Sequence, residues 1–343
     1  MHHNVKKFKI CMMAPFILHT SSISNIAELL SENLEREGHT VLRVSTKTST
    51  PFKITMFLKL LRVSRNYDII HVHCASYWGV LPALMGSLAG KICNKRIVTT
   101  YHGGAANQFF RRWIFFIKPF FKQVTITVPS QFLRNIFENF GLTATVIPNI
   151  LDLKKFQYKG RPNIKPKLLF AKHLKSEYNP EMGIKAFKIV KSVFPQGKMK
   201  IVGSGPLEDK LKNLIKELKL DDVEFVRPIA YDKIPLLYSS MDICINCSNV
   251  ESFGMVIVEA FACGLPVVST DVGGISSIIQ DNINGLLVFP NDHKAMAKKV
   301  IYLLENPNYT LKMTENARKW VEENCAWESV KHKLLRIYEG EEQ

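Results

Sequence analysis

Short apolar runs alternate with amphipathic segments along almost the whole sequence, and this alternation limits the possible folds more than any other feature. Runs such as 9–14, 67–73 and 96–100 have the length and composition of buried strands. The segments between them space their apolar residues as one face of a helix does. Strands that alternate with helices favour parallel sheets covered by helices, so the predicted fold class is α/β.

The length of the chain predicts two domains. With 343 residues, the chain exceeds the size at which a single core stops growing, about 250 to 300 residues. The polar segment 159–166 contains Gly and Pro and lacks periodicity, which is typical of a linker. We therefore expect one domain at 1–160, a second at 161–325, and a final helix at 326–343 that packs back on the first domain.

The first residues allow two interpretations. Lys6, Lys7 and Lys9 precede a short apolar run that ends at Leu18, which imitates a signal peptide. The run contains Pro15, lacks a clear small-residue cleavage site and is followed at once by an amphipathic helix pattern. We therefore interpret it as a first β-strand.

The cysteines indicate a reducing compartment. There are seven, an odd number and scattered, which argues for free thiols and for a cytoplasmic protein. Cys244 and Cys247 have the CxxC spacing of metal and redox sites, but they lie in a segment with the pattern of a strand. Residues three apart on a strand point to opposite faces, so we expect no metal site there.

The balance of charge predicts an anionic partner. Lys and Arg number 46 against 30 Asp and Glu, a net charge of +16. A phosphorylated ligand, an acidic lipid surface and a nucleic acid all match this charge. No nucleic-acid-binding motif accompanies it, so nucleic acid is not an expected partner. No apolar run is long enough to span a bilayer.

Two segments are basic and apolar at once, 53–62 and 108–122. The second interleaves seven aromatic residues with four cations, which suits a helix lying in an anionic lipid interface. A core helix with a basic outer stripe is the alternative, and both interpretations remain open. On the first interpretation the protein lies on the inner face of the cytoplasmic membrane.

The stretch 248–274 is the most informative for chemistry. A polar loop follows a strand pattern and opens a helix at Gly254. The backbone N–H groups of Phe253, Gly254 and Met255 can therefore meet an anion together with the positive end of the helix dipole. This arrangement is typical of a phosphate-binding site.

Two glutamates of the same stretch are candidate ligands for hydroxyl groups. Glu251 lies in the loop and Glu259 in the helix, about 8 Å further along, so the two can hold different parts of one long ligand. An ionised carboxylate accepts hydrogen bonds from sugar hydroxyls and from a ribose diol. Two solvated glutamates are the alternative, but Glu259 sits in an otherwise apolar helix, where an unpaired carboxylate is costly.

This stretch resembles the signature of glycosyltransferase family 4, the group 1 sugar transferases of the GT-B fold. It has two glutamates spaced as E-x7-E, followed by C-G-x-P-V-V and a pair of glycines. The resemblance covers nearly the whole chain through further segments with the family's pattern: 38–39, 68–73, 100–103, 128–130, 146–149, 203–206, 238–242 and 284–288. It implies two Rossmann-like domains facing across a cleft, the first on the acceptor side and the second binding the nucleotide-sugar donor.

The resemblance also implies roles for single residues. Glu251 would hold the hydroxyls of the donor sugar and Glu259 the ribose, while the amides of 253–255 and Gly203 would meet the sugar and diphosphate. His102, on a loop after a strand of the first domain, would face the transferred sugar. A loop histidine satisfied by its neighbours is the alternative for His102.

A further implication of the resemblance is a reaction that keeps the configuration at the anomeric carbon. In the family's usual account the departing diphosphate takes the acceptor proton, so the protein only places the substrates and stabilises the leaving group. Apart from the nucleotide-sugar we expect no cofactor and no metal. His71 and His73 alternate on one strand face, and we interpret them mainly as structural, with acceptor lining as the alternative.

Two segments depart from the family's pattern. Where the family usually shows G-R-L-x-x-x-K-G, this chain has KHLKSEYN at 172–179, and Thr-Ser-Ser-Ile-Ser at 20–24 replaces paired glycines. Lys172 or Lys175 can supply the missing cation and His173 a hydrogen bond, although lysine lacks the bidentate guanidinium. A shifted diphosphate grip, weak donor binding and lost catalysis all remain open.

The predicted function is a retaining, hexosyltransferase-type glycosyltransferase. It would move a sugar from a nucleotide-diphosphate-sugar to a glycan or lipid-linked acceptor, in cell-envelope polysaccharide or lipopolysaccharide synthesis. A nucleotide-sugar epimerase or hydrolase of the same fold is one alternative, but no acid/base set for it is visible. A non-catalytic binder of anionic ligands or membranes is the other, and it leaves Glu251, Glu259 and the glycines unexplained.

Overall fold

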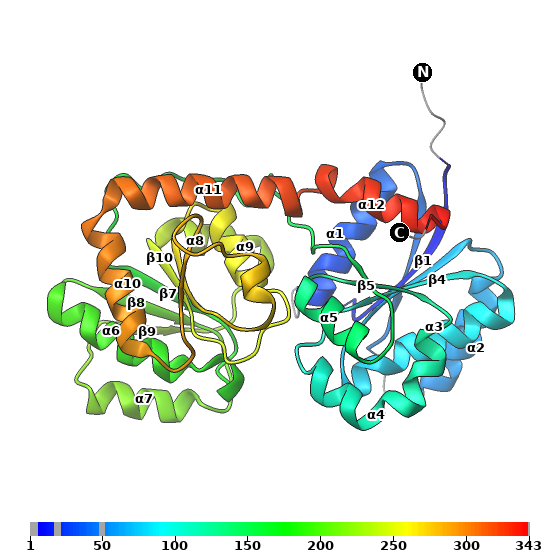
Figure 1. Cartoon of the computed structure of the whole chain (residues 1–343), viewed down its shortest axis with the longest axis horizontal. Helices are drawn as coiled ribbons and strands as arrows, with labels where there is room; N and C mark the ends of the chain where they lie inside the picture. The colour runs from blue at the N-terminus through cyan, green and yellow to red at the C-terminus, as the bar shows by residue number, and fades with distance from the viewer. Residues whose placement is uncertain (1–5, 17–21, 48–51, 342–343) are drawn as a thin grey trace, which may run out of the picture. The chain divides into compact units, whose positions relative to one another are not determined.

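The computed structural model describes residues 6–16, 22–47 and 52–341, without the side chains of 52–56 and 59. The chain divides into two compact units (Figure 1). The first comprises 1–150 with 327–343, and the second comprises 151–326. Each unit is built around its own parallel sheet.

The sheet of the first unit has six strands in the order β2-β1-β3-β4-β5-β6, and every pairing is parallel. The strands are β1 (Lys9–Ala14), β2 (Thr40–Ser45), β3 (Ile69–Cys74), β4 (Arg96–Tyr101), β5 (Thr125–Val128) and β6 (Thr145–Val146). The apolar run near the start of the sequence is thus a strand, as we interpreted it, and it lies inside the sheet.

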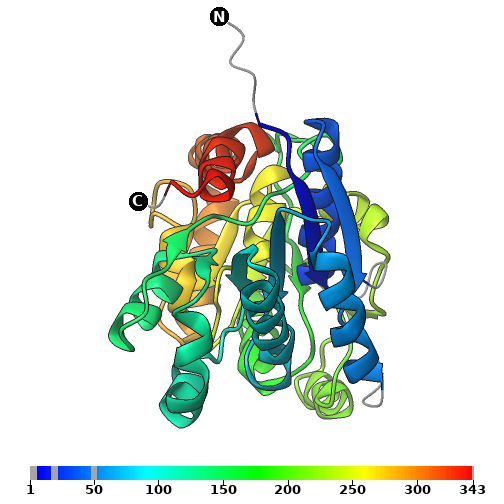
Figure 2. The same ribbon diagram turned by 90° about the vertical axis from the view of Figure 1, so that its right-hand side faces the viewer.

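Helices cover both faces of this sheet (Figure 2). They are α1 (Ser22–Arg36), α2 (Phe52–Ser64), α3 (Leu81–Cys93), α4 (Ala106–Phe121), α5 (Gln131–Asn139) and α12 (Trp327–Glu339). One core joins the sheet to α1 and α12, and the other joins it to α2, α3, α4 and α5. Ser130 caps α5, because its side chain accepts a hydrogen bond from the Leu133 amide at 3.3 Å.

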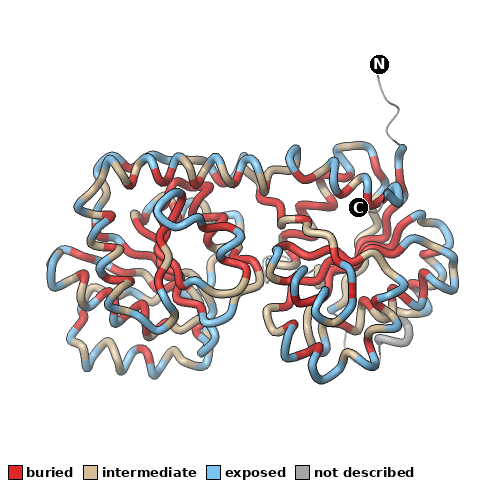
Figure 3. Tube along the Cα trace, viewed as in Figure 1, coloured by how far each residue is buried: buried red, intermediate tan, exposed pale blue. Residues whose placement is uncertain are grey.

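The second unit repeats the architecture with the strand order β12-β11-β10-β7-β8-β9. Its strands are β7 (Lys167–Ala171), β8 (Lys198–Val202), β9 (Val223–Val226), β10 (Ile243–Asn246), β11 (Val267–Thr270) and β12 (Leu286–Val288). Its helices are α6 (Pro180–Val193), α7 (Glu208–Glu217), α8 (Ile234–Ser240), α9 (Met255–Ala262), α10 (His293–Glu305) and α11 (Pro307–Cys325). Figure 3 shows buried residues concentrated along the strands of both units.

Cys244 and Cys247 lie in different cores of the second unit, one on each face of the sheet. Both are buried free thiols. The expectation that the CxxC spacing separates the two sulfurs is confirmed.

The segment 159–166, which we expected to be the linker, lies inside the second unit. Its Arg161 is buried and donates hydrogen bonds to five backbone carbonyls of that unit. The segment was interpreted as a linker because it is polar and lacks periodicity. These features of the sequence cannot reveal that the guanidinium of Arg161 points into the core. The units divide instead between Ile150 and Leu151, and the final helix α12 belongs to the first unit.

Both sheets contain a point where the strand order reverses. In the first unit this point lies between β1 and β3, and in the second between β7 and β10. Loops that leave the carboxyl ends of two such strands run in opposite directions and open a crevice, which is where parallel α/β sheets bind ligands.

Candidate functional site

Charged and polar side chains collect at the reversal point of the second sheet. Lys172 directly follows β7, while Ser248 and Glu251 follow β10, the neighbouring strand. The predicted donor-binding residues of this unit therefore come from the two loops where topology favours a ligand site.

Lys172 and Glu251 form an ion pair, and their side chains are only 8% and 14% exposed. The Lys172 ammonium also donates to Ser248 Oγ at 2.9 Å and lies 5.0 Å from the centre of the Tyr178 ring. We expected Glu251 as a sugar ligand and Lys172 as a diphosphate cation, and the structure brings the two together. A shielded pair of this kind holds both groups in one geometry, because separating either charge from the other is costly.

A buried polar network lies beneath this pair. Ser248 Oγ donates to Asn246 Oδ1 at 3.0 Å, and Asn246 Nδ2 donates to Ser269 Oγ at 2.8 Å. The Thr270 hydroxyl donates to the Ser248 carbonyl at 2.6 Å. All four residues are fully buried, so the network fixes the ends of β10 and β11 under Lys172. Sequence reasoning missed this network; small polar residues at the ends of two apolar strands were its only signal.

The loop that departs from the family's pattern is held from two sides. The Leu174 amide donates to the Ser204 carbonyl at 3.0 Å, and the Asn249 amide donates to the Glu177 carbonyl at 2.7 Å. Gly203 has a φ of +149°, and a Cβ added there would lie 2.1 Å from the Lys172 carbonyl oxygen. Only glycine allows this approach, so Gly203 acts here by its missing side chain.

The three candidate polar residues of this loop differ in position. Lys172 points into the site, as described above. Lys175 is exposed and forms a loose ion pair with Glu177 at 4.0 Å. His173 is exposed, and in the described part of the chain its side chain forms no hydrogen bond or ion pair. Of the three, Lys172 is the one the structure places beside Glu251.

The loop after β10 ends in a helix start that offers free donors. Gly254, with a φ of 105°, precedes α9, and the Gly274 amide donates to the Glu251 carbonyl at 2.9 Å. Among the described residues, no acceptor takes a hydrogen bond from the amides of Phe253, Gly254 or Met255. Such amides at a helix N-terminus attract anions. The side chain of Phe253 is buried in the core.

Glu259 is a buried carboxyl in α9, with Tyr238 as its partner. The Tyr238 hydroxyl donates to Glu259 Oε2 at 2.9 Å. Burial nevertheless raises the pKa of Glu259 to about 7, because the hydrogen bond only partly offsets the loss of hydration. Glu259 is therefore not a solvated glutamate, and no cation among the described residues forms an ion pair with its carboxyl.

The raised pKa predicts that Glu259 makes the stability of the protein fall as pH rises. The usual pKa of the group is 4.5, so between pH 4.5 and about 7 the folded state keeps a proton that the unfolded state has lost. The free energy of unfolding should fall by about 3 kcal/mol across this window. We expect Glu259→Gln to remove that fall and to stabilise the protein at pH 8.5 but not at pH 4.5.

Urea titrations at the two pH values measure this difference. Glu217→Gln, which changes an exposed glutamate of α7, is the matched control and should leave the pH dependence as it is. An unchanged pH dependence in Glu259→Gln would show that the buried carboxyl does not carry the effect.

In the first unit, three histidines stack at the end of β3 and β4. The ring centres of His71 and His73 are 4.8 Å apart, and those of His73 and His102 are 5.2 Å apart. His73 Nδ1 is hydrogen-bonded to His102 Nε2 at 2.9 Å, and His71 to the Tyr338 hydroxyl at 2.6 Å. The prediction that His71 and His73 share one face of their strand is confirmed.

These histidines are neutral at physiological pH. Burial lowers the pKa of His102 to about 4 and that of His71 to about 3, and it holds the pKa of His73 well below the usual value. His102 is thus a hydrogen-bonding group and not a cation in this state. In the described residues, the buried Nε2 of His73 has no partner.

Three further expectations concern the segment 20–24, metal ions and membrane-spanning helices. Thr20 and Ser21, in the segment that replaces the family's paired glycines, lie outside the described residues, and Ser22–Ser24 begin α1. No group of three or more His, Cys, Asp or Glu side chains that suits a metal is found among the residues described. In the same part of the chain, no helix is both long and apolar enough to cross a membrane.

Two family models match the chain, one after the other. Residues 27–155 match the model described as Glycosyltransferase Family 4, and residues 153–320 match the model described as Glycosyl transferases group 1. Together they include every candidate site residue named above.

Similar proteins are found among both sequences and structures. N-acetyl-alpha-D-glucosaminyl L-malate synthase of Bacillus anthracis is 27% identical over 87% of this chain and 82% of its own length. GDP-mannose-dependent alpha-(1-6)-phosphatidylinositol monomannoside mannosyltransferase of Mycolicibacterium smegmatis is 25% identical over 92% of this chain and 87% of its own. The crystal structure of Anabaena Alr3699/HepE in complex with UDP is similar in fold, with a TM-score of 0.78 and 19% identity, over 97% of this chain and 100% of that one.

Proposed function

This chain belongs to the group 1 glycosyltransferases of family 4, and from this premise we propose that it transfers a hexosyl unit from a nucleoside-diphosphate-sugar with retention of configuration. The observation that carries the proposal is the shielded Lys172–Glu251 pair beside the free amides of 253–255. A carboxylate, an ammonium and a helix N-terminus together match a donor that has hydroxyls at one end and a diphosphate next to them.

Each group at this site has a distinct role in the proposal. Glu251 accepts hydrogen bonds from hydroxyls of the donor sugar, and the amides of 253–255 bind the diphosphate. Glu259 accepts from the ribose, whose hydroxyls replace the water that burial has removed from the carboxyl. Binding a hydroxyl donor favours the ionised form, so the ligand should lower the pKa of Glu259.

The altered loop leaves three possibilities: a shifted diphosphate-binding position, weak donor binding or lost catalysis. The position of the Lys172 ammonium favours the first. In the family's pattern, the lysine stands at the position of Tyr178 in this chain. Lys172 stands earlier in the loop, two residues before Leu174, but its ammonium lies over the ring of Tyr178. A lysine acts on phosphate as a point charge, so the place of its ammonium matters more than the place of its Cα.

The reaction then needs little acid/base chemistry from the protein. The departing diphosphate takes the proton of the acceptor hydroxyl, while Lys172 and the amides stabilise the charge that develops on it. No metal or cofactor is part of the proposal. His102 faces the transferred sugar as a neutral imidazole, which fits the lowered pKa of this group.

For the acceptor we propose a lipid-linked glycan of cell-envelope polysaccharide or lipopolysaccharide synthesis, at the inner face of the cytoplasmic membrane. The exposed aromatic and basic side chains of α4 support this choice. A phosphatidylinositol mannoside appears in the name of the mycobacterial relative, whereas the name of the Bacillus relative contains malate. The surface of α4 favours the lipid case.

Thermal unfolding with a panel of nucleotides and nucleotide-sugars tests the donor site. A ligand at about 100 times its Kd stabilises the folded state by about 2.7 kcal/mol, and the melting temperature should then rise by about 5 to 10 °C. We expect this rise in melting temperature with diphosphate nucleotides of one base. Nucleoside monophosphates should give a smaller rise.

Two lysine variants sharpen the test. Lys172→Gln should lose most of the rise with the diphosphate, whereas Lys175→Gln, with the same charge change in the same loop, should keep it. Equal responses in both variants would contradict the role of Lys172. The absence of a rise with every nucleotide in the unmodified protein would contradict a working donor site.

A further inference from the structure

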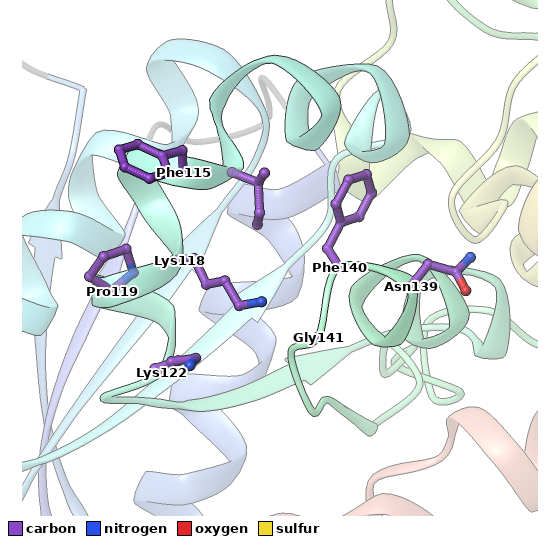
Figure 4. A pocket seen from close by; sticks show the side chains of 8 residues that line it. Phe115, Lys118, Pro119, Lys122, Asn139, Phe140 and Gly141 are labelled. Carbon is purple, nitrogen blue, oxygen red and sulfur yellow. The ribbon is translucent and has the colours of Figure 1, made fainter.

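A groove on the first unit lies between α4 and the end of α5. Its volume is about 690 Å³, and residues of α4 and the following turn form one wall. Asn139, Phe140 and Gly141 form the other (Figure 4). Neither the donor site nor the stacked histidines include any of these residues.

Two lysines supply the charge of the groove. Lys118 is half-buried, and its side chain extends from α4 toward Gly141 (Figure 4). A Cβ added at Gly141 would lie 2.8 Å from Lys118 Nζ, so the glycine leaves room for the ammonium. Lys122 lines the same groove and is exposed. In the described part of the chain, the ammonium group of neither lysine forms a hydrogen bond or an ion pair.

Apolar groups surround these ammonium groups. Phe115 and Pro119 of α4 line the groove opposite Phe140. Phe115 is 84% exposed and the adjacent Phe116 is 64% exposed, with Trp113 also exposed one turn away. A site for a small hydrophilic anion would gain nothing from this rim, whereas an amphiphile with a charged head would bury it.

The helices on the face of the sheet that carries the groove have mostly positive charge, and the one glutamate of α5, Glu138, is paired with Arg134. The sequences of α2, α3 and α4 contain no Asp or Glu, but all three contain Lys or Arg. The helix α1, on the other face of the same sheet, carries three glutamates, each of them paired with an arginine. The neighbouring helix α3 adds the exposed apolar residues Leu88 and Ile92. The helical layer with the groove thus combines positive charge with exposed apolar area.

We propose that this groove binds the phosphate of an anionic phospholipid, with Lys118 and Lys122 on the phosphate and Phe115 and Phe116 among the acyl chains. Two unpaired cations at the base of an apolar rim match the two parts of such a lipid. The inference rests on the membrane part of the proposed function, but it needs neither a donor nor sugar transfer. It can therefore fail while the donor site stands.

Sedimentation with lipid vesicles tests the proposal on the full chain. The vesicles are phosphatidylcholine alone or mixed with an equal amount of phosphatidylglycerol. We expect binding to the mixed vesicles only, and we expect Lys118→Gln/Lys122→Gln to weaken it about thirty-fold, since each cation at the surface contributes about 1 kcal/mol. Phe115→Ser keeps the charge and should weaken binding about ten-fold.

A matched variant separates the groove from net charge. Lys294→Gln/Lys298→Gln removes two exposed, unpaired lysines of α10 in the second unit and should change vesicle binding less than about three-fold. Equal losses in the two double variants would overturn the site, because net charge alone would then explain binding. All variants should keep the nucleotide response of the donor site, which also shows that they are folded.

Two further outcomes would assign the groove to another ligand. Displacement from vesicles by millimolar inorganic phosphate, beyond the effect of chloride at the same ionic strength, would identify free phosphate and overturn the lipid assignment. Binding of single-stranded RNA that is tighter than binding to the mixed vesicles, and is lost in Lys118→Gln/Lys122→Gln, would overturn it in favour of nucleic acid.

Discussion

Glu251→Gln is expected to lower kcat by about 10² to 10³-fold while the protein remains folded. The substitution keeps the shape of the side chain and an oxygen that accepts hydrogen bonds, but it removes the charge. Lys172 then loses its counter-ion, and the donor sugar loses an ionised acceptor. The loss should appear in kcat more than in KM, because the amides of 253–255 and Glu259 still bind the nucleotide.

Glu177→Gln is the matched control for this experiment. Glu177 lies on the adjoining loop, its side chain is exposed, and its backbone contact with Asn249 does not depend on its charge. Glycosyl transfer at near-normal rate is expected in this variant. Normal turnover in Glu251→Gln would exclude the proposed role of its carboxylate, whatever the effect on binding.

The sequence was sufficient for the architecture of both units. Alternating strand and helix patterns predicted two parallel sheets, and the two faces of Cys244 and Cys247 followed from local rules. These features depend on neighbours in the chain, for which periodicity is informative. The chemistry at the start of α9 was predictable for the same reason, since loop, helix start and both glutamates lie in one stretch.

Contacts between distant segments could not be predicted in this way. The ion pair of Lys172 with Glu251 joins loops that follow different strands, and the hydrogen bond of Tyr238 to Glu259 joins two helices. The resemblance singled out Glu251 and Glu259, but it gave no partner for either. The pairing arises from the strand order, which places β7 beside β10. The pattern of residues along the chain does not reveal the order of the strands in the sheet.

Arg161 is the clearest case of a residue that local reasoning assigned wrongly. It lies in the polar segment interpreted as a linker, yet it is buried and donates to the carbonyls of Tyr238 and Met241 at 2.9 and 3.0 Å. It also donates to the carbonyls of Cys263 and Gly264, both at 2.8 Å. These carbonyls lie at the ends of α8 and α9, where carbonyls run out of intrahelical donors, although the Tyr238 carbonyl also accepts from the Met241 amide at 3.3 Å. One guanidinium thus ties together the helices that carry Tyr238 and Glu259.

Arg161→Met is therefore expected to lower the free energy of unfolding by about 3 to 5 kcal/mol and the melting temperature by about 10 °C. Methionine fills part of the volume but leaves buried carbonyls without donors, and it leaves Asp242, 3.9 Å from Arg161 Nε, without its cation. The matched control is Arg134→Met, which removes an exposed ion pair with Glu138 and should cost less than about 0.5 kcal/mol. A loss below about 1 kcal/mol in Arg161→Met would show that α8 and α9 hold their positions without the clamp. With the larger loss, nucleotide binding should weaken as well, because Tyr238 and Glu259 would no longer be held in register.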